Sequence, residues 1–324
     1  MQAVVFKRTG NPKEVLSFQD IPRPRLESDE VLVRIEASPI HPSDIMFISG
    51  NYRIEPTFPQ TAGLEGVGTI VELGKNVNTA LDLKVGNLVV FRHPGTWAEE
   101  AAVPQEKVYI LPESLTWEEA TEVFLNPITA WGLLQSSGVR SGDSILSTAG
   151  ASSVGRWLAS FAKAKGIRLI AIVRSSASAE QVLEAGAETA LLETEAKPEQ
   201  VISLTQGGVA AAFDAVGGRQ GQLALESLQN GGRLLVYGRM SGDPYPLHNN
   251  LIMYRNLSIS GFGILAYLEN TSRSDIQWIL QEASRHIKTG HSNSEATSRY
   301  ELKDFLAAVD GSGSHNFFRL NLQQ

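Results

Sequence analysis

The stretch that decides the fold is Asp143-Ser-Ile-Leu-Ser-Thr-Ala-Gly-Ala-Ser-Ser-Val-Gly-Arg-Trp-Leu-Ala159, in the middle of the chain. A short apolar strand runs through a turn of small residues directly into a helix, and a second apolar strand, Ile167–Arg174, follows that helix. Small residues allow backbone N–H groups to approach a pyrophosphate, and the helix N-terminus supplies a partial positive charge beneath it. The pattern predicts a dinucleotide-binding turn.

The end of the second strand indicates which dinucleotide is bound. NAD-specific sites usually place an Asp or Glu here for the ribose 2′-hydroxyl, whereas a 2′-phosphate requires a cation and hydroxyls. This chain has Arg174, Ser175 and Ser176 at that point, and no acidic residue closes the strand. We therefore expect the cofactor to be NADPH.

The glycine pattern of the turn is incomplete. The usual fingerprint is G-x-G-x-x-G, and this chain has Gly150 and Gly155 with Ser152 and Ser153 between them. An alternative interpretation is an ordinary strand–helix–strand crossover whose small residues only permit tight packing. The order of strand, helix and second strand, together with Arg174, favours the nucleotide site.

Composition restricts the class of protein. A chain of 324 residues suggests two domains, and its hydrophobic content of 42% is typical of a globular α/β protein. The formal net charge of −7 argues against a nucleic-acid surface, and no apolar run is long enough for a membrane span. The absence of cysteine excludes disulfides, iron–sulfur clusters and thiolate zinc ligands. Because the first residues also lack the apolar region of a signal peptide, we expect a soluble, cytoplasmic protein with a small-molecule substrate.

The pattern of predicted secondary structure changes near residue 118. Before it, short strand-like runs are separated by Gly, Pro, Asn and Asp, which predicts a β-rich domain. After a helix predicted over Thr116–Leu134, strands and helices alternate up to Gly261, as in a doubly wound parallel sheet. A long helix over Ser274–Thr289 and a last strand over Phe317–Leu322 follow. We predict an α/β fold in which residues 1–118 and 264–324 form the β-rich domain and residues 119–263 form the nucleotide-binding domain.

Seven further motifs occur in order along the chain: Ser38–Arg53, Ala62–Gly68, Gly95–Glu100, Leu125–Trp131, Phe213–Gly218, Tyr237–Met240 and Ser260–Gly263. With these motifs the chain resembles the medium-chain dehydrogenase/reductase superfamily over nearly its full length. Within it, the chain is most similar to the zinc-free quinone oxidoreductases and 2-enoyl thioester reductases, above all the mitochondrial trans-2-enoyl-CoA reductase type. The resemblance implies a GroES-like catalytic domain, a Rossmann nucleotide-binding domain and a homodimer.

Metal chemistry separates the branches of this superfamily. Zinc alcohol dehydrogenases have a cysteine in the loop around His41 and a histidine in a Gly-His-Glu motif. That motif reads Gly63-Leu-Glu65 here, and Leu64 cannot bind a metal. The six histidines are scattered without ligand spacing. We therefore expect no metal site, and His41 is expected to be structural or to line a pocket.

The resemblance also assigns site residues by position. Tyr52 matches the tyrosine that hydrogen-bonds the developing enolate in thioester reductases, and its alternative role is to pack the rim of the site. Asn126 and Thr129 match a motif beside the nicotinamide, with a proline-containing helix interior as the alternative. The expected cofactor contacts are Thr148, Gly150, Ala151, Ser152, Ser153, Val154, Gly155, Arg174, Ser175, Ser176, Val216, Gly217, Tyr237, Gly238, Arg239, Phe262 and Gly263.

Taken together, the sequence predicts a zinc-independent, NADPH-dependent reductase of an activated C=C bond, in a 2-enoyl thioester or enone, or of a quinone. The alternative is an NADPH-binding protein with little or no turnover, as in the lens zeta-crystallins or a sensor. Arg53, Arg92 and Arg255 are candidates for a basic mouth that binds the phosphorylated end of a thioester, or else solvated surface arginines. Asp214 is a candidate ligand of a ribose hydroxyl, and its alternative role is to cap a turn.

Overall fold

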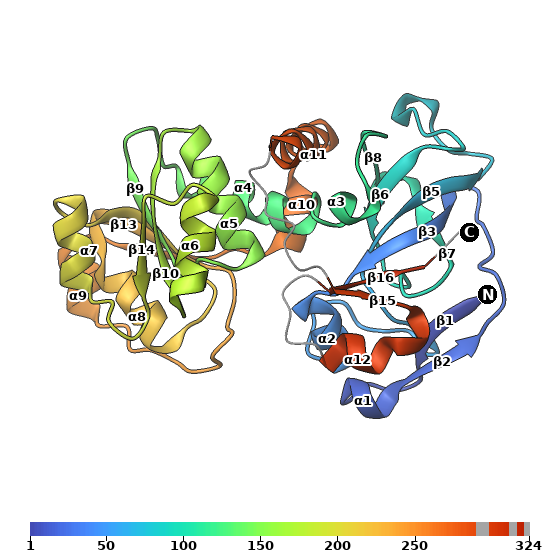
Figure 1. Cartoon of the computed structure of the whole chain (residues 1–324), viewed down its shortest axis with the longest axis horizontal. Helices are drawn as coiled ribbons and strands as arrows, with labels where there is room; N and C mark the ends of the chain where they lie inside the picture. Colours follow the sequence, from blue (N-terminus) through green and yellow to red (C-terminus); the bar gives the residue numbers. More distant parts are fainter. Residues whose placement is uncertain (290–297, 311–315, 321–324) are drawn as a thin grey trace. The chain divides into compact units, whose positions relative to one another are not determined.

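The computed structural model describes residues 1–289, 298–310 and 316–320 (Figure 1). The chain divides into two compact units. Unit 1 contains residues 1–124 together with the described residues from 298 onward, and unit 2 contains the described residues from 125 to 289. Each unit has its own buried core of apolar side chains.

Unit 1 consists mainly of β-strands. These are β1 (Gln2–Phe6), β2 (Leu16–Asp20), β3 (Glu30–Pro39), β4 (Gln60–Thr61), β5 (Glu65–Leu73), β6 (Leu88–Arg92), β7 (Glu100–Pro104), β8 (Val108–Ile110), β15 (Ser298–Tyr300) and β16 (Asn316–Arg319). Its helices are α1 (Pro12–Val15), α2 (Pro42–Ile48), α3 (Trp117–Thr121) and α12 (Phe305–Asp310), with 3₁₀ turns at Thr79–Leu81, Gln105–Lys107 and Leu302–Asp304.

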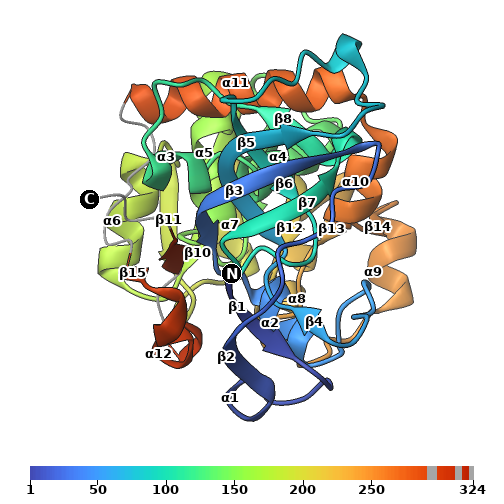
Figure 2. The ribbon, with the colours of Figure 1, turned by 90° about the vertical axis from the view of Figure 1, so that its right-hand side faces the viewer.

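The strands of unit 1 form two sheets. The larger has the order β15-β16-β3-β5-β6-β8, with β7 also paired to β3, and the smaller has the order β2-β1-β4. Figure 2 looks onto this unit and shows β3, β5 and β6 side by side. Alternate side chains of β3, such as Val31, Val33 and Ile35, are buried with Val89 of β6 in one cluster. The C-terminal strand β16 pairs antiparallel with β3, so the end of the chain returns to the first unit, as expected.

Unit 2 alternates strands and helices. Its strands are β9 (Ser144–Ser147), β10 (Arg168–Val173), β11 (Thr189–Leu192), β12 (Val209–Asp214), β13 (Leu228–Val236) and β14 (Ser258–Gly261). Its helices are α4 (Leu125–Ser137), α5 (Ser153–Ala164), α6 (Ser176–Glu184), α7 (Pro198–Thr205), α8 (Gly218–Glu226), α9 (Asn249–Tyr254), α10 (Ile264–Asn270) and α11 (Arg273–Lys288).

The six strands of unit 2 form one sheet of order β11-β10-β9-β12-β13-β14, and every neighbouring pair is parallel. The chain therefore builds outward from β9 in one direction and from β12 in the other, with helices on both faces (Figure 1). This confirms the predicted doubly wound Rossmann sheet. In such sheets ligands bind at the carboxyl ends of the strands, at the point where the strand order reverses. Here that point lies between β9 and β12.

One predicted helix is divided in two. Thr116 caps α3, since its hydroxyl accepts a hydrogen bond from the Glu119 N–H at 3.2 Å, but α3 ends at Thr121. A new helix, α4, begins at Leu125, which places Pro127 in its first turn. The missing N–H of proline costs nothing there, because the first N–H groups of a helix have no partner within it. The break removes the kink that a proline in a helix interior would cause.

Helices α10 and α11 pack on α4, in unit 2. Trp278 of α11 meets Trp131 of α4 with ring centroids 4.7 Å apart, and Ile276, Ile279 and Leu280 of α11 are buried. The prediction that residues 264–324 belong to the β-rich domain is therefore wrong for these two helices. The packing of the described residues groups them with the parallel sheet.

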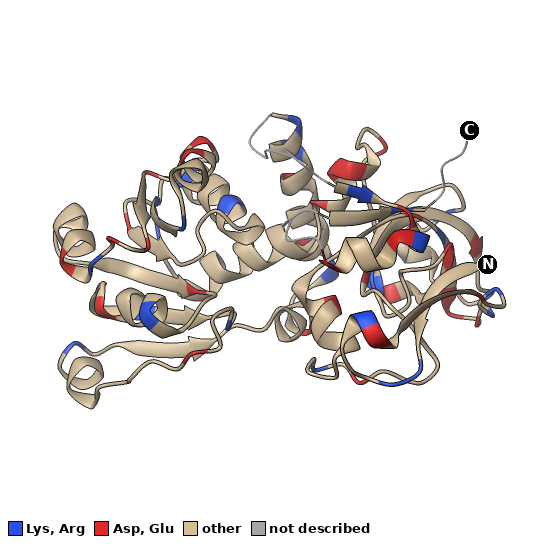
Figure 3. Ribbon diagram, turned by 60° about the horizontal axis from the view of Figure 1, so that its bottom comes forward, with Lys and Arg blue, Asp and Glu red and all other residues tan. Residues whose placement is uncertain are grey.

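Charged residues of both signs are interspersed along the two units (Figure 3). In the whole chain 28 Lys and Arg stand against 35 Asp and Glu. No helix in the described ranges combines the length and the apolar character that a membrane span requires.

Candidate active site

The dinucleotide turn leads from β9 into α5, as the sequence predicts. Ser152 is the N-cap of α5, and its hydroxyl accepts a hydrogen bond from the Gly155 N–H at 3.2 Å. The Gly150 N–H donates to the Ile172 carbonyl at 2.8 Å, which ties the turn to the neighbouring strand β10. The first N–H groups of a helix have no carbonyl partner within it, so the start of α5 offers donors and positive potential to an anion.

This turn is closely packed and still offers an unused hydroxyl. A Cβ on Gly155 would lie 2.1 Å from the Gly150 carbonyl oxygen, so a larger residue cannot enter without opening the turn. Ser153 begins α5, and its buried Oγ has no hydrogen-bond partner among the described residues. A pyrophosphate oxygen would satisfy that donor. The residues present therefore fit a dinucleotide, with the first turn of α5 holding its phosphates.

Asp214 holds the strand ends beside the turn. At the end of β12, its Oδ1 accepts hydrogen bonds from Thr148 Oγ1 at 2.8 Å, from the Val216 N–H at 2.9 Å and from the Gly217 N–H at 3.1 Å. The Thr148 hydroxyl in turn accepts from the Ala215 N–H at 2.9 Å. Both side chains are fully buried. Asp214 therefore caps the turn. The Thr148 hydroxyl links the ends of β9 and β12, and both of its hydrogen bonds are made within the protein.

Three candidate residues for the 2′-phosphate follow β10. Arg174, Ser175 and Ser176 are all exposed, and within the described ranges Arg174 forms no ion pair. Ser175 caps α6, with its hydroxyl accepting from the Ser178 N–H at 3.2 Å. The guanidinium is thus available at the same edge of the sheet as the phosphate turn.

Tyr237, Gly238 and Arg239 follow the end of β13. The hydroxyl of Tyr237 is buried, and burial raises its pKa above the ordinary value, so it remains a proton donor. Arg239 is exposed. Phe262 follows β14, where its N–H donates to the Val236 carbonyl at 2.9 Å, and the space around the Cβ position of Gly263 is open.

The predicted cofactor residues thus share one location. They follow β9, β10, β12, β13 and β14, and the carboxyl ends of parallel strands meet at a single edge of the sheet. This edge is where a doubly wound fold binds its ligand. These segments are far apart in the sequence, but they meet at one edge because each of them directly follows a strand of the same parallel sheet.

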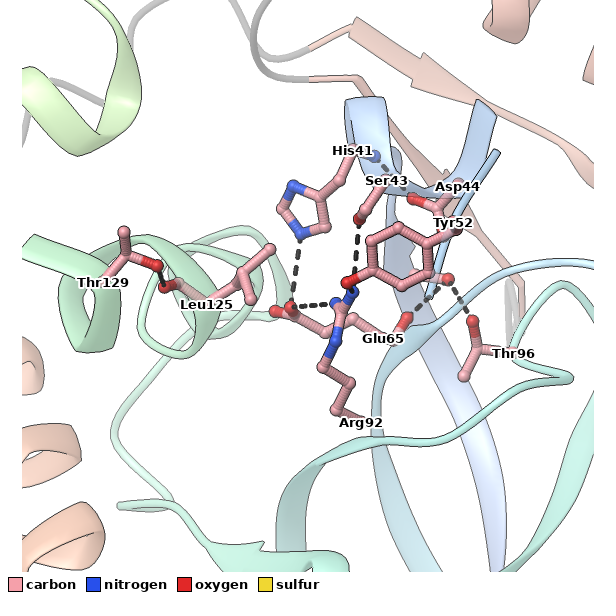
Figure 4. A network of polar contacts seen from close by, with 10 residues as sticks. His41, Ser43, Asp44, Tyr52, Glu65, Arg92, Thr96, Leu125 and Thr129 are labelled. Atoms are coloured by element: carbon pink, nitrogen blue, oxygen red, sulfur yellow. Dashed lines mark hydrogen bonds and ion pairs between the residues drawn. The ribbon is translucent and has the colours of Figure 1, made fainter. Parts of the chain in front are cut away.

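Two of the predicted catalytic residues lie on α4, in unit 2. The Thr129 hydroxyl donates to the Leu125 carbonyl one turn earlier at 2.7 Å (Figure 4), so its proton is used within the helix and its oxygen can only accept. Thr129 is buried, and Asn126 is half-exposed.

Tyr52, the third predicted catalytic residue, lies in unit 1 just after α2. Gly50 adopts a positive φ of 74° after the last turn of α2, which lets the chain reverse there. The ring of Tyr52 packs against the apolar cluster that contains Phe47, and its hydroxyl oxygen lies 3.0 Å from Arg92 Nη2 (Figure 4). Arg92 Nη2 also donates to Ser43 Oγ at 3.2 Å.

A cluster of buried charges surrounds this hydrogen bond. Glu65 is fully buried, with one carboxylate oxygen 3.2 Å from His41 Nε2 and 3.9 Å from Arg92 Nη1. Burial, the largest single effect, lowers the pKa of His41, but the charge and hydrogen bond of Glu65 together with the charge of Asp44 outweigh it and raise the pKa above its ordinary value of 6.5. Asp44 accepts the His41 backbone N–H at 2.6 Å, and burial raises the pKa of Asp44. The buried guanidinium of Arg92 is tolerated here because the Glu65 carboxylate balances its charge.

The role of Arg92 and Glu65 is not evident from the sequence. Arg92 is buried beside Tyr52, so both sequence interpretations of it, a basic mouth and a solvated surface residue, are wrong. Arg92 ends β6 directly opposite Glu65 at the start of β5. Opposite charges on facing residues of adjacent strands favour their pairing, so the opposite charges of Glu65 and Arg92 at the ends of these two strands are the sequence signal that could have indicated the pair.

The described residues contain no group of three or more His, Cys, Asp or Glu side chains placed to hold a metal ion. Leu64, at the position of the zinc-ligating histidine of the alcohol dehydrogenases, is fully buried in an apolar cluster. His291 and His315 lie outside the described residues.

Comparison with known families and structures gives consistent matches for both units. The alcohol dehydrogenase GroES-like domain matches residues 27–113, and the zinc-binding dehydrogenase family matches residues 153–284. The mitochondrial enoyl-(acyl-carrier-protein) reductase of Homo sapiens is 28% identical over 321 residues, covering 96% of this chain and 85% of that protein. The corresponding reductase of Arabidopsis thaliana is 30% identical over 277 residues, covering 82% and 73%. The structure of Escherichia coli quinone oxidoreductase complexed with NADPH superposes with a TM-score of 0.85 at 25% identity, over 98% of this chain and 100% of that one.

Proposed function

The chain belongs to the medium-chain dehydrogenase/reductase superfamily, and we propose that it is a zinc-independent, NADPH-dependent reductase of an activated C=C bond or of a quinone. A relative that the match covers over 85% of its length is an enoyl-(acyl-carrier-protein) reductase, and a structural neighbour is a quinone oxidoreductase. The proposal rests on one observation in each unit. In unit 2 a turn suited to phosphate has Arg174 at the same sheet edge, and in unit 1 a buried arginine holds the hydroxyl of a tyrosine.

NADPH is the cofactor. The first turn of α5 offers N–H donors and the unpaired Ser153 hydroxyl to the pyrophosphate, while Arg174 offers a guanidinium to the 2′-phosphate. Arginine suits this task because its planar fork forms paired, charge-assisted hydrogen bonds with phosphate oxygens. When bound, NADPH would supply the hydride that reduces the substrate.

The protein must manage the charge that hydride addition creates. For an activated C=C bond, the electron pair of the former double bond would move toward the carbonyl oxygen, which becomes an enolate oxygen until the α-carbon takes up a proton from solvent water. We assign the hydrogen bond to that oxygen to Tyr52, whose phenol O–H can donate one hydrogen bond. Donors placed where negative charge develops accelerate such reactions, typically by about a hundredfold or more.

The test is oxidation of NADPH, followed by its absorbance, with crotonyl-CoA, a long-chain 2-enoyl-CoA, a small enone and a benzoquinone. Saturable turnover of a thioester would assign the chain to enoyl reduction, and the long-chain substrate would test the open space beside Gly263. Turnover of the quinone or enone alone would assign it to the quinone reductases. Tight NADPH binding without turnover of any substrate would contradict the proposal and favour a non-catalytic role.

We also propose that the protein is a homodimer and is cytoplasmic. Support for the dimer comes from β14, the last strand in the sheet order of unit 2, whose outer edge pairs with no strand in the described ranges. Unpaired strand edges favour addition of another strand. Met253 and Tyr254 of α9, the helix that precedes β14 in the chain, are largely exposed and offer apolar surface to a partner. Subcellular fractionation would test the location.

A further inference from the structure

Arg92 is held in place by the fold of unit 1. It is the last residue of β6, and in the antiparallel register of β5 and β6 it faces Glu65, the first residue of β5. Its side chain is only 6% exposed, and the Glu65 carboxylate, 3.9 Å from Nη1, balances its charge. A long side chain that is buried, paired and anchored in a sheet loses the rotamer freedom it would have on the surface. The guanidinium therefore has a defined position.

The chemistry of the guanidinium determines the direction of its hydrogen bond with Tyr52. Arginine carries five N–H donors and no acceptor, so in the 3.0 Å contact the Tyr52 oxygen must be the acceptor. The proton of the phenol then points away from Arg92. Within the described ranges this hydroxyl donates to no protein acceptor. The phenol is thus left with one hydrogen bond to give and no protein group in the described ranges to receive it.

We propose that Arg92 is a positioning residue for Tyr52: it occupies the acceptor side of the phenol, so that the remaining hydrogen bond is donated to the oxygen of the substrate. The inference rests on the proposed reductase function and deepens it. In this arrangement the guanidinium and the oxygen of the substrate lie on opposite sides of the phenol oxygen. A hydrogen bond that a cation donates to the phenol oxygen strengthens the phenol as a donor.

Ser43 completes the support. Arg92 Nη2 donates both to Tyr52 Oη and to Ser43 Oγ, and Ser43 lies in the first turn of α2, the helix that precedes the Tyr52 loop. The same nitrogen thus connects the two ends of the α2 segment to the β5–β6 hairpin. Removing the guanidinium would free the phenol to rotate and to donate elsewhere.

The test is a double-mutant cycle on kcat with a substrate that the wild-type enzyme reduces. Arg92→Met is expected to lower kcat about ten- to a hundredfold with little change in the affinity for NADPH, and Tyr52→Phe about a hundredfold. In the Tyr52→Phe background, Arg92→Met should cause almost no further loss, because the group it positions is absent. Arg92→Lys, which restores a cationic donor, should recover part of the activity.

The matched control is Arg34→Met. Arg34 also lies in the large sheet of unit 1 and pairs with a glutamate, Glu36, at 2.8 Å, but it does not contact Tyr52. This variant should leave kcat unchanged. If Arg92→Met alone does not fold, because Glu65 is left buried beside His41, the pair Arg92→Met with Glu65→Gln removes both charges and replaces it in the cycle.

The outcomes separate the inference from the proposed function. Absence of turnover by the wild-type enzyme would overturn the proposed function and this inference with it. The inference alone would be overturned if the wild type is active and Arg92→Met lowers kcat equally in the wild-type and Tyr52→Phe backgrounds. A merely structural arginine would act in this way, independently of Tyr52. Unchanged kcat in Arg92→Met would do the same.

Discussion

Arg174 is the cation that we propose distinguishes the two nicotinamide cofactors. It directly follows β10, is exposed and pairs with no carboxylate in the described ranges. A charge-assisted hydrogen bond of this kind typically contributes about 1.5–3 kcal/mol. NADH lacks the 2′-phosphate, so only the binding of NADPH gains from it.

Arg174→Ala is expected to weaken NADPH binding about ten- to a hundredfold and to leave NADH binding nearly unchanged. Fluorescence titration with each cofactor measures both affinities. Arg168→Ala is the matched control, because Arg168 lies at the opposite end of the same strand and pairs there with Glu188 at 3.9 Å. An equal loss for the two cofactors in Arg174→Ala would contradict the assignment.

His41 makes the stability of unit 1 depend on pH. Because Glu65 raises the pKa of His41 above 6.5, the folded chain binds this proton more tightly than the unfolded chain does. The stabilisation is fully present below pH 6.5 and is lost as the pH rises through the folded-state pKa. Glu65, Asp44 and Arg92 are the charged groups that face the imidazole.

The free energy of unfolding should therefore fall as the pH rises above 6.5, and His41→Gln should make this decline shallower. Urea unfolding at a series of pH values checks it. His93→Gln is the control of opposite sign, since burial lowers the pKa of His93 and the associated stability is instead lost as the pH falls below 6.5. A decline of the same slope in His41→Gln as in the wild type would rule out His41 as the source.

The turn that leads into α5 has no room for a side chain at Gly155, because backbone atoms rather than flexible side chains occupy the space. A Cβ on Gly155 would meet the carbonyl group of Gly150, which must then move out of the turn. Gly155→Ala is expected to cost about 1–3 kcal/mol of stability and to weaken NADPH binding. Calorimetric unfolding and cofactor titration measure the two effects. Gly261→Ala is the control, because nothing lies within 4 Å of its Cβ position; similar effects from both changes would refute the packing argument.

Local patterns predicted the elements, whereas long-range pairing determined the candidate site. The strand, turn and helix around Gly150 are consecutive in the sequence, so their order alone predicted the phosphate turn. Glu65 and Arg92 are brought together only by the register of β5 and β6, which the apolar pattern of the two strands does not fix. The family resemblance supplied Tyr52, but its partner follows from the structure alone.

At the scale of the whole chain, the pairing of strands was easier to predict from the sequence than the surface on which each helix packs. A last apolar strand after the parallel sheet indicated a return to the first unit, and β16 does pair with β3. An amphipathic helix such as α11 shows from its sequence only that one face must be buried. Its partner, α4, is decided by side-chain fit such as that of Trp131 with Trp278.

The proposed dimer makes a prediction about the open edge of the parallel sheet. The Phe262 N–H donates to the Val236 carbonyl of β13, so by the two-residue period of a strand the Gly261 N–H points to the outer edge of β14. A second β14 would require that donor. Gly261→Pro removes it without removing a hydrogen bond to β13, and proline is tolerated on edge strands.

Gly261→Pro is therefore expected to shift the protein from dimer to monomer in sedimentation velocity, while circular dichroism and NADPH binding remain those of the wild type. Gly261→Ala keeps the N–H and should remain dimeric. Because the Cβ position of Gly261 has open space around it, loss of the dimer in the proline variant alone would identify the backbone donor as the cause. A wild-type protein that sediments as a monomer, or a proline variant that stays dimeric, would exclude pairing through this edge.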